Sequence, residues 1–67
     1  MMRVLINGRA HELAESCTVA GAVAAAGVPA RGTAVALDGQ LVPRAEWTRT
    51  ELTPGARLEV LTAVQGG

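Results

Sequence analysis

The sequence predicts an α+β fold in which a mixed sheet of four to five strands wraps around one helix. Turn signals at Asn7-Gly8, Asp38-Gly39 and Thr53-Pro54-Gly55 separate short apolar runs of strand length. One segment, residues 18–26, instead has apolar side chains at helical spacing. At 67 residues the chain has room for one small domain. Its core must consist of Val, Leu, Ile and Ala, because Trp47 is the single aromatic residue.

The first two strands are predicted to form a hairpin. Met2 to Ile6 is apolar and partly β-branched, and Arg9 to Leu13 alternates roughly between apolar and polar residues. Asn7-Gly8 between them favours a type I′ turn, because that turn needs a positive φ at both central positions. We therefore expect the two strands to be antiparallel neighbours.

The helix is predicted over Thr18 to Ala26. Thr18 is a good N-cap, since its hydroxyl can accept a hydrogen bond from the first turn, and Gly27 with Pro29 ends the helix. The apolar residues at i, i+3, i+4 and i+7 form one face of small side chains, which lets the helix lie close to a sheet: Val19, Ala22, Val23 and Ala26.

The second half of the chain predicts another hairpin and a final strand. Thr33 to Leu37 and Gln40 to Val42 flank Asp38-Gly39, and Pro43 favours an edge position for the shorter strand. Arg44 to Thr48 is predicted to be a short helical turn that carries Trp47 into the core. The last strand, Arg57 to Val64, has apolar residues on both faces, which is typical of a central strand. We expect it to insert beside the first strand.

Composition excludes several classes of function. Six Arg balance six acidic residues, and no Lys and no basic stripe occur, which argues against nucleic-acid binding. Cys17 is the single cysteine, and His11 has no second ligand at metal spacing, so we expect neither a disulfide nor a metal site. We interpret Cys17 as structural or incidental, and His11 as a surface or sheet-facing residue rather than a catalytic one. The N-terminal apolar run is too short for a signal peptide or a membrane span, which predicts a cytoplasmic protein without membrane contact.

The sequence closes on Gly66-Gly67, directly after the last predicted strand. Two glycines leave the terminal carboxylate without a neighbouring side chain, on a backbone that can adopt almost any φ and ψ. We expect residues 1–64 to form the domain and residues 65–67 to be a flexible arm that enters the active site of a partner. A carboxylate is an anion at pH 7 and a poor electrophile, so a partner must activate it.

Three segments carry a resemblance to a known family. The motif Val42-Pro43-Arg44-x-x-Trp47, the segment Leu52 to Leu61 and the closing Ala63-Val64-Gln65-Gly66-Gly67 resemble the corresponding stretches of ThiS-like sulfur carriers of thiamine biosynthesis. The resemblance covers the whole chain. It departs from the family pattern at Ala56, where Asp is common, and at Asp38, where Asn is frequent. Both positions are predicted to lie in turns.

The resemblance implies a ubiquitin-like β-grasp fold and a carrier that is a protein co-substrate rather than an enzyme. In such carriers an E1-like adenylyltransferase uses ATP to adenylate the terminal carboxylate, which is here that of Gly67. Sulfur from a sulfur-donating enzyme then replaces the adenylate, and thiazole synthase takes it from the resulting thiocarboxylate to build the thiazole ring. No cofactor is expected to be bound, because ATP and the sulfur donor act through the partners.

Partner contacts are expected along the arm, on the last strand and after the edge strand: Val64, Gln65, Gly66, Leu61 and Arg44. A solvated sheet face is predicted to carry Arg3, Arg57 and Glu59. With Leu61 and Ala63 this face is a candidate docking surface.

Several alternatives for the function remain open. The chain could be the small subunit of molybdopterin synthase or another sulfur carrier with the same tail chemistry. It could also be a ubiquitin-like protein modifier, or a non-reactive β-grasp interaction module in which the glycines are incidental.

Overall fold

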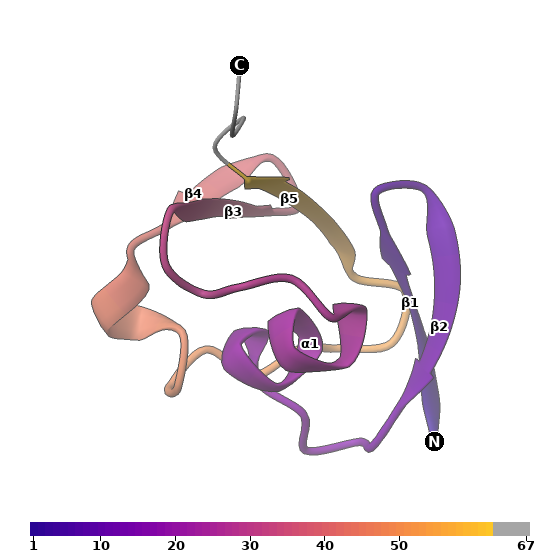
Figure 1. Cartoon of the computed structure of the whole chain (residues 1–67). Coiled ribbons are helices and arrows are strands. Elements are labelled where there is room, and N and C mark those ends of the chain that lie inside the picture. Colours follow the sequence, from indigo (N-terminus) through magenta and orange to yellow (C-terminus); the bar gives the residue numbers. More distant parts are fainter. Residues whose placement is uncertain (63–67) are drawn as a thin grey trace.

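The computed structural model describes residues 1–62, and these form one sheet, one α-helix and one short 3-10 helix (Figure 1). The predicted elements are all present, and the α+β class with a five-stranded mixed sheet around one helix is confirmed. In chain order they are β1 (Met2–Ile6), β2 (Arg9–Leu13), α1 (Val19–Ala26), β3 (Thr33–Leu37), β4 (Gln40–Val42), η1 (Arg44–Glu46) and β5 (Arg57–Thr62).

The strand order in the sheet is β2-β1-β5-β3-β4. The last strand therefore lies in the centre, as predicted, where it runs parallel to β1 and antiparallel to β3. The short strand β4 lies at the edge and ends before Pro43, also as predicted. Figure 1 shows the sheet curving around α1, which covers one of its faces. This is the β-grasp arrangement.

Two tight turns set the register of the two hairpins. The φ angles are 52° at Asn7 and 83° at Gly8, and 49° at Asp38 and 87° at Gly39. A positive φ at both central positions defines a type I′ turn, whose twist matches that of the flanking strands. The strands consequently pair without a slip from their turns outward, starting at Ile6 opposite Arg9 and at Leu37 opposite Gln40.

The helix begins and ends where its capping residues predict. The Thr18 hydroxyl accepts a hydrogen bond from the Gly21 amide at 3.3 Å, and Gly27 adopts a φ of 78°. The structure adds a feature that was not predicted: the loop before β5 binds the start of the helix. The amide of Val19 donates to the carbonyl of Thr50 at 2.9 Å, so a donor that a helix start leaves unpaired finds a distant partner.

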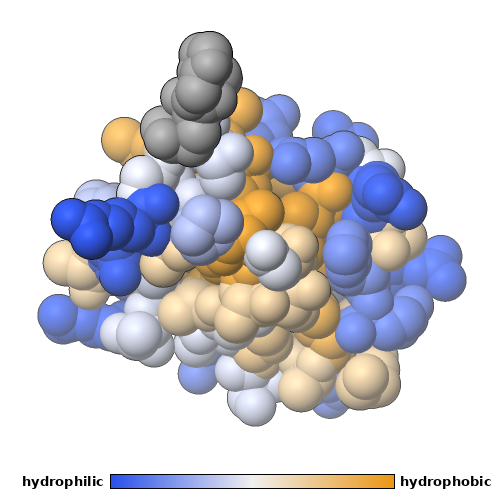
Figure 2. Space-filling view, viewed as in Figure 1, coloured by the Kyte–Doolittle hydropathy of each residue, from blue (hydrophilic) through white to orange (hydrophobic). Residues whose placement is uncertain are grey.

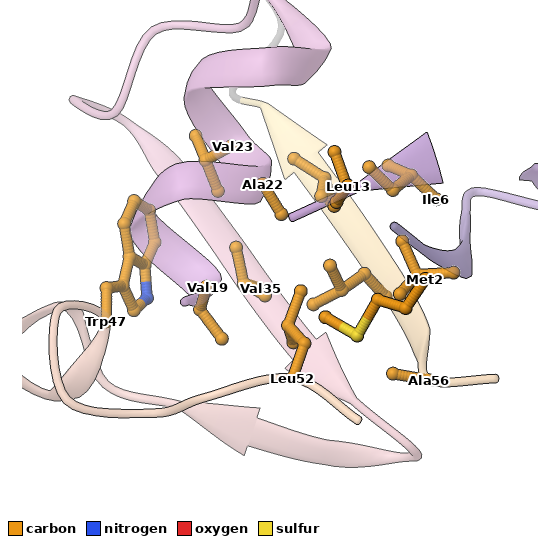
Figure 3. Packing of buried hydrophobic residues seen from close by; sticks show 13 residues of the cluster. Met2, Ile6, Leu13, Val19, Ala22, Val23, Val35, Trp47, Leu52 and Ala56 are labelled. Carbon is orange, nitrogen blue, oxygen red and sulfur yellow. The ribbon is translucent and has the colours of Figure 1, made fainter. Parts of the chain in front are cut away.

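The core lies between α1 and the inner face of the sheet. In Figure 3, Val19, Ala22 and Val23 point from the helix toward the strands, and the indole of Trp47 closes one side of the cluster. Trp47 is buried, as predicted, and its Nε1 donates to the carbonyl of Val42 at 2.9 Å. Ala22 is fully buried, which allows the backbones of helix and sheet to approach closely. The other buried members are Met2, Val4, Ile6, Leu13, Val35, Leu52, Ala56, Leu58 and Val60.

One expectation needs correction. β5 is a central strand, as predicted. The reason given for this, that apolar residues on both of its faces mark a strand buried on both sides, is wrong. Leu58 and Val60 are buried, whereas Leu61 on the opposite face is 71% exposed, because the helix covers only one face of the sheet. Ala56 closes a turn by donating its amide to the carbonyl of Thr53 at 3.0 Å, yet its side chain also belongs to the core.

Within the part of the chain that the structure describes, no helix has the length and apolar character needed to cross a bilayer.

Candidate functional site

The candidate site is the region where β5 leads toward the end of the chain. Four of the predicted site residues, Val64, Gln65, Gly66 and Gly67, lie outside the described residues, as does the predicted domain boundary after residue 64. Leu61 and Arg44 lie within them. The structure therefore shows how the strand before the predicted reactive end is held, and which surfaces surround it.

Strand β5 is paired unequally on its two sides. Toward β3 the register runs over five residue pairs, from Leu37 opposite Leu58 to Thr33 opposite Thr62. Toward β1 it covers only two pairs, which end with Ile6 opposite Leu58. The second half of β5 thus continues beyond the end of β1, where the first hairpin turns away.

Side chains from the two hairpin turns bind the backbone of β5 at different points. The Asp38 carboxylate accepts a hydrogen bond from the amide of Arg57 at 2.9 Å, at the start of the strand. The Asn7 side chain makes two hydrogen bonds to Val60: its Oδ1 accepts from the amide at 2.8 Å, and its Nδ2 donates to the carbonyl at 3.1 Å. Sequence reasoning interpreted Asn7 and Asp38 as turn residues alone, and no local signal indicates partners so distant along the chain.

The outer face of the sheet carries the exposed apolar side chains of the site. Cross-strand partners share a face, so the pairing places Leu61 with Ala34, and Leu41 with Ala36, on the side away from the helix. Leu61 and Leu41 are each 71% exposed. We call this surface the outer sheet face, and it consists of Arg3, Leu5, Ala10, Glu12, Ala34, Ala36, Leu41, Arg57, Glu59 and Leu61.

The charged side chains of the outer sheet face are solvated, as predicted. Arg3 and Glu12 form an exposed ion pair at 3.2 Å across β1 and β2. Arg57 and Glu59 alternate with the buried residues of β5, and with Leu5 and Leu61 they line a hollow of about 740 Å³ between β1 and β5. The outer sheet face thus combines exposed apolar side chains with charged ones, and Arg57 and Glu59 lie on its central strand, β5.

Arg44 lies on a different surface from Leu61. Its guanidinium carbon lies 5.3 Å from the centroid of the Trp47 ring, within the range of a cation–π contact. Together with Ala20, Val23 and Ala24 of the helix it lines a separate hollow of about 340 Å³. The structure thus does not bring the two predicted partner-binding residues together.

The remaining candidate side chains are Cys17, which packs against the core, and His11. Cys17 is half-buried, and its Sγ donates to the carbonyl of Thr18 at 3.4 Å. His11 lies on β2, opposite Val4, and is partly buried. Among residues 1–62 no polar or charged side chain is buried, and no three potential metal ligands gather.

Comparison with known proteins points to one family. The sequence model of the ThiS family matches residues 4–67. The crystal structure of a thiamine biosynthesis protein (ThiS) from Geobacter metallireducens has 29% sequence identity and a TM-score of 0.82, and the alignment covers 98% of this chain and all of that one. An NMR solution structure of a thiamine biosynthesis protein from the same organism gives the same identity and TM-score, with 98% and 88% covered.

A search of curated proteins finds no match. The family match nevertheless spans almost the whole sequence, and the structural match extends over the same elements at a high TM-score. The resemblance seen in the sequence motifs is thereby confirmed. The chain belongs to the ThiS family.

Proposed function

We propose that this chain is a sulfur carrier of thiamine biosynthesis whose C-terminal glycine is adenylated and then converted to a thiocarboxylate. Its membership of the ThiS family and its likeness to the thiamine biosynthesis protein of Geobacter metallireducens support the carrier role. The observation that carries the proposal is the central position of β5. This strand is built into the sheet on both sides and leads into the Gly66-Gly67 pair with which the sequence closes.

The proposed chemistry takes place on the carboxyl carbon of Gly67. A carboxylate oxygen attacks the α-phosphorus of ATP, pyrophosphate leaves, and an acyl adenylate forms. A sulfur nucleophile at the oxidation level of sulfide then attacks the carbonyl carbon, and AMP leaves with the C–O bond electrons. The resulting thiocarboxylate is a better nucleophile than the carboxylate, so it can deliver sulfur to thiazole synthase without release of free sulfide.

The catalytic groups for these steps are proposed to belong to the partners. An E1-like adenylyltransferase binds the ATP, and a sulfur-donating enzyme supplies the sulfur. Gly66 and Gly67 act through what they lack: a Cβ on either would narrow the conformations available in a partner's channel.

We propose that the adenylyltransferase holds the carrier on the part of the outer sheet face around Leu61 on β5, and not on the edge strand β4 that carries Leu41. Leu61 is strongly exposed and lies on the strand that leads to the reactive end, and Val64, Gln65 and Gly66 would continue the contact. Arg44 lies on another surface, so we propose it as a separate partner contact.

The test is reconstitution of the first two steps with the cognate adenylyltransferase, ATP and sulfide. The full chain should form an acyl adenylate and then a thiocarboxylate, both visible by intact-mass spectrometry. Deletion of Gly67, or one residue added after it, should abolish both products while the circular dichroism spectrum stays unchanged. Adenylation of the truncated chain at the normal rate would show that Gly67 is not the reactive end. Attachment of the chain to protein amines in place of thiocarboxylate formation would identify a modifier.

The thiamine assignment is tested separately from the tail chemistry. A strain that lacks the gene should recover growth when the thiazole precursor of thiamine is supplied. If growth recovers only when the product of the molybdopterin pathway is supplied, the thiamine assignment is wrong, while the proposed carrier chemistry still holds.

A further inference from the structure

The second half of β5 depends on a side chain for its attachment to the first hairpin. The amide of Asn7 donates to the carbonyl of Leu58 at 2.8 Å, which is the last main-chain hydrogen bond between the two segments in the described structure. One rung further along the strand, the Val60 amide and carbonyl both bind the Asn7 side chain, although the two residues are 53 positions apart. The carboxamide thus continues the parallel ladder after the main chain has turned away.

The geometry explains why the residue is an asparagine. Asn7 has a φ of 52° and directs its backbone into the turn, so its own carbonyl cannot serve as the next rung. A carboxamide offers one acceptor and one donor, the same pair that a strand residue would present. Aspartate tolerates the same backbone conformation, as Asp38 shows in the other hairpin, but it cannot donate to the Val60 carbonyl.

Solvent-accessible hollows lie on both sides of this contact. Asn7 lines the hollow of about 740 Å³ on the outer sheet face, and also one of about 340 Å³ between the hairpin, α1 and β5. Figure 2 shows apolar surface in the region that α1, β5 and the hairpin surround in Figure 1. Side-chain packing next to the carboxamide is therefore incomplete, so its two hydrogen bonds hold that side of the strand.

We propose that Asn7 is a positioning residue that holds the second half of β5 on its β1 side and so orients the strand that precedes the reactive terminus. The inference rests on the proposed function, because it concerns the delivery of Gly67 to the adenylyltransferase. Val60 precedes Gly67 by seven positions, and without these two hydrogen bonds the second half of β5 is held on the β3 side alone, which loosens the orientation of the strand. Loss of orientation of that kind lowers the rate of a step that needs near-attack geometry.

The test compares two matched variants of the full chain. Asn7→Gly keeps the turn, since Gly-Gly also forms type I′ turns, and removes both hydrogen bonds to Val60. Asp38→Gly makes the same change in the other hairpin and removes the hydrogen bond to Arg57 at the opposite end of the strand. Asn7→Asp retains the acceptor and loses only the donor, and serves as the conservative variant.

Two measurements separate positioning from a loss of stability. The first is hydrogen exchange of the Val60 amide by NMR, which should accelerate about 10- to 100-fold in Asn7→Gly and not in Asp38→Gly. The second is ATP–pyrophosphate exchange by the adenylyltransferase at varied carrier concentration. A lower folded fraction raises the apparent KM and leaves kcat unchanged, whereas a misplaced terminus lowers kcat at saturation. We expect kcat to fall about tenfold for Asn7→Gly, less for Asn7→Asp, and to stay within about twofold for Asp38→Gly.

The outcomes are distinguishable. A wild-type chain that is not adenylated overturns the proposed function, and the inference with it. A wild-type chain that is adenylated, with equal kcat for Asn7→Gly and Asp38→Gly, overturns the inference alone. If Asn7→Gly does not fold, Asn7→Asp decides: a kcat equal to that of the wild-type chain contradicts the positioning role.

Discussion

Replacement of Leu61 by Ala tests the proposed docking surface most sharply. Burial of a whole Leu side chain stabilises by about 1.5–3 kcal/mol. Since 71% of Leu61 is exposed in the free carrier, covering that part on docking contributes about 1–2 kcal/mol. At 1.4 kcal/mol per factor of ten, Leu61→Ala should raise the KM of the adenylyltransferase for the carrier by about 5- to 30-fold.

The same substitution should leave the fold unaffected, because an exposed side chain contributes within about 0.5 kcal/mol to the free energy of unfolding. The assay is ATP–pyrophosphate exchange as a function of carrier concentration, combined with urea unfolding of each variant. Leu41→Ala is the matched control, because Leu41 has the same 71% exposure on the same face but lies on the edge strand β4. Its KM should stay within about twofold of the wild-type value.

Val60→Ala is a second control, at the position next to Leu61 on β5. It should change the stability of the carrier and not its docking. Val60 is only 7% exposed, so its truncation should lower the free energy of unfolding by about 2 kcal/mol. Its KM, corrected for the folded fraction, should not change. The docking surface is refuted if Leu61→Ala leaves KM unchanged, or if Leu61→Ala and Leu41→Ala raise it equally.

Three further substitutions test the account of the fold and the second surface. A Cβ on Gly21 would lie 2.8 Å from Cys17 Sγ, so Gly21→Ala alone should not stabilise the protein. In a chain that already carries Cys17→Ala, the same substitution should raise the free energy of unfolding in urea by about 0.5–1 kcal/mol. Trp47→Ala should cost about 3–5 kcal/mol and show as lost cooperative unfolding, whereas a stable Trp47→Ala variant would contradict its place in the core. Arg44→Ala should cost about 0.5–1 kcal/mol through the lost contact with the indole, and an additional rise in KM for either partner enzyme would identify the partner it contacts.

The elements that could be predicted from the sequence are those with local causes. Asn7-Gly8 and Asp38-Gly39 determine their hairpins, because few residue pairs tolerate two successive positive φ angles. Thr18 and Gly27 mark the helix for a similarly local reason. The resemblance to the ThiS family also depended on short motifs, which is why the fold and the family were both correctly anticipated.

The features that could not be predicted depend on residues far apart in the chain. The contact of Asn7 with Val60 exists only because β5 returns beside β1, and nothing next to Asn7 in the sequence indicates it. The exposure of Leu61 depends on which face α1 covers, which alternation along β5 alone does not reveal. For the same reason Leu61 and Arg44 were predicted as members of one set of contacts, although the structure places them on separate surfaces.

The most direct test of the central claim is the intact mass of the chain purified from its host. A sulfur carrier should yield a fraction in which one terminal oxygen is replaced by sulfur, located by fragmentation at Gly67. That fraction should disappear when the adenylyltransferase gene is deleted. A chain that carries no sulfur although the adenylyltransferase, ATP and a sulfur source are present would contradict the proposed function and favour a non-reactive interaction module.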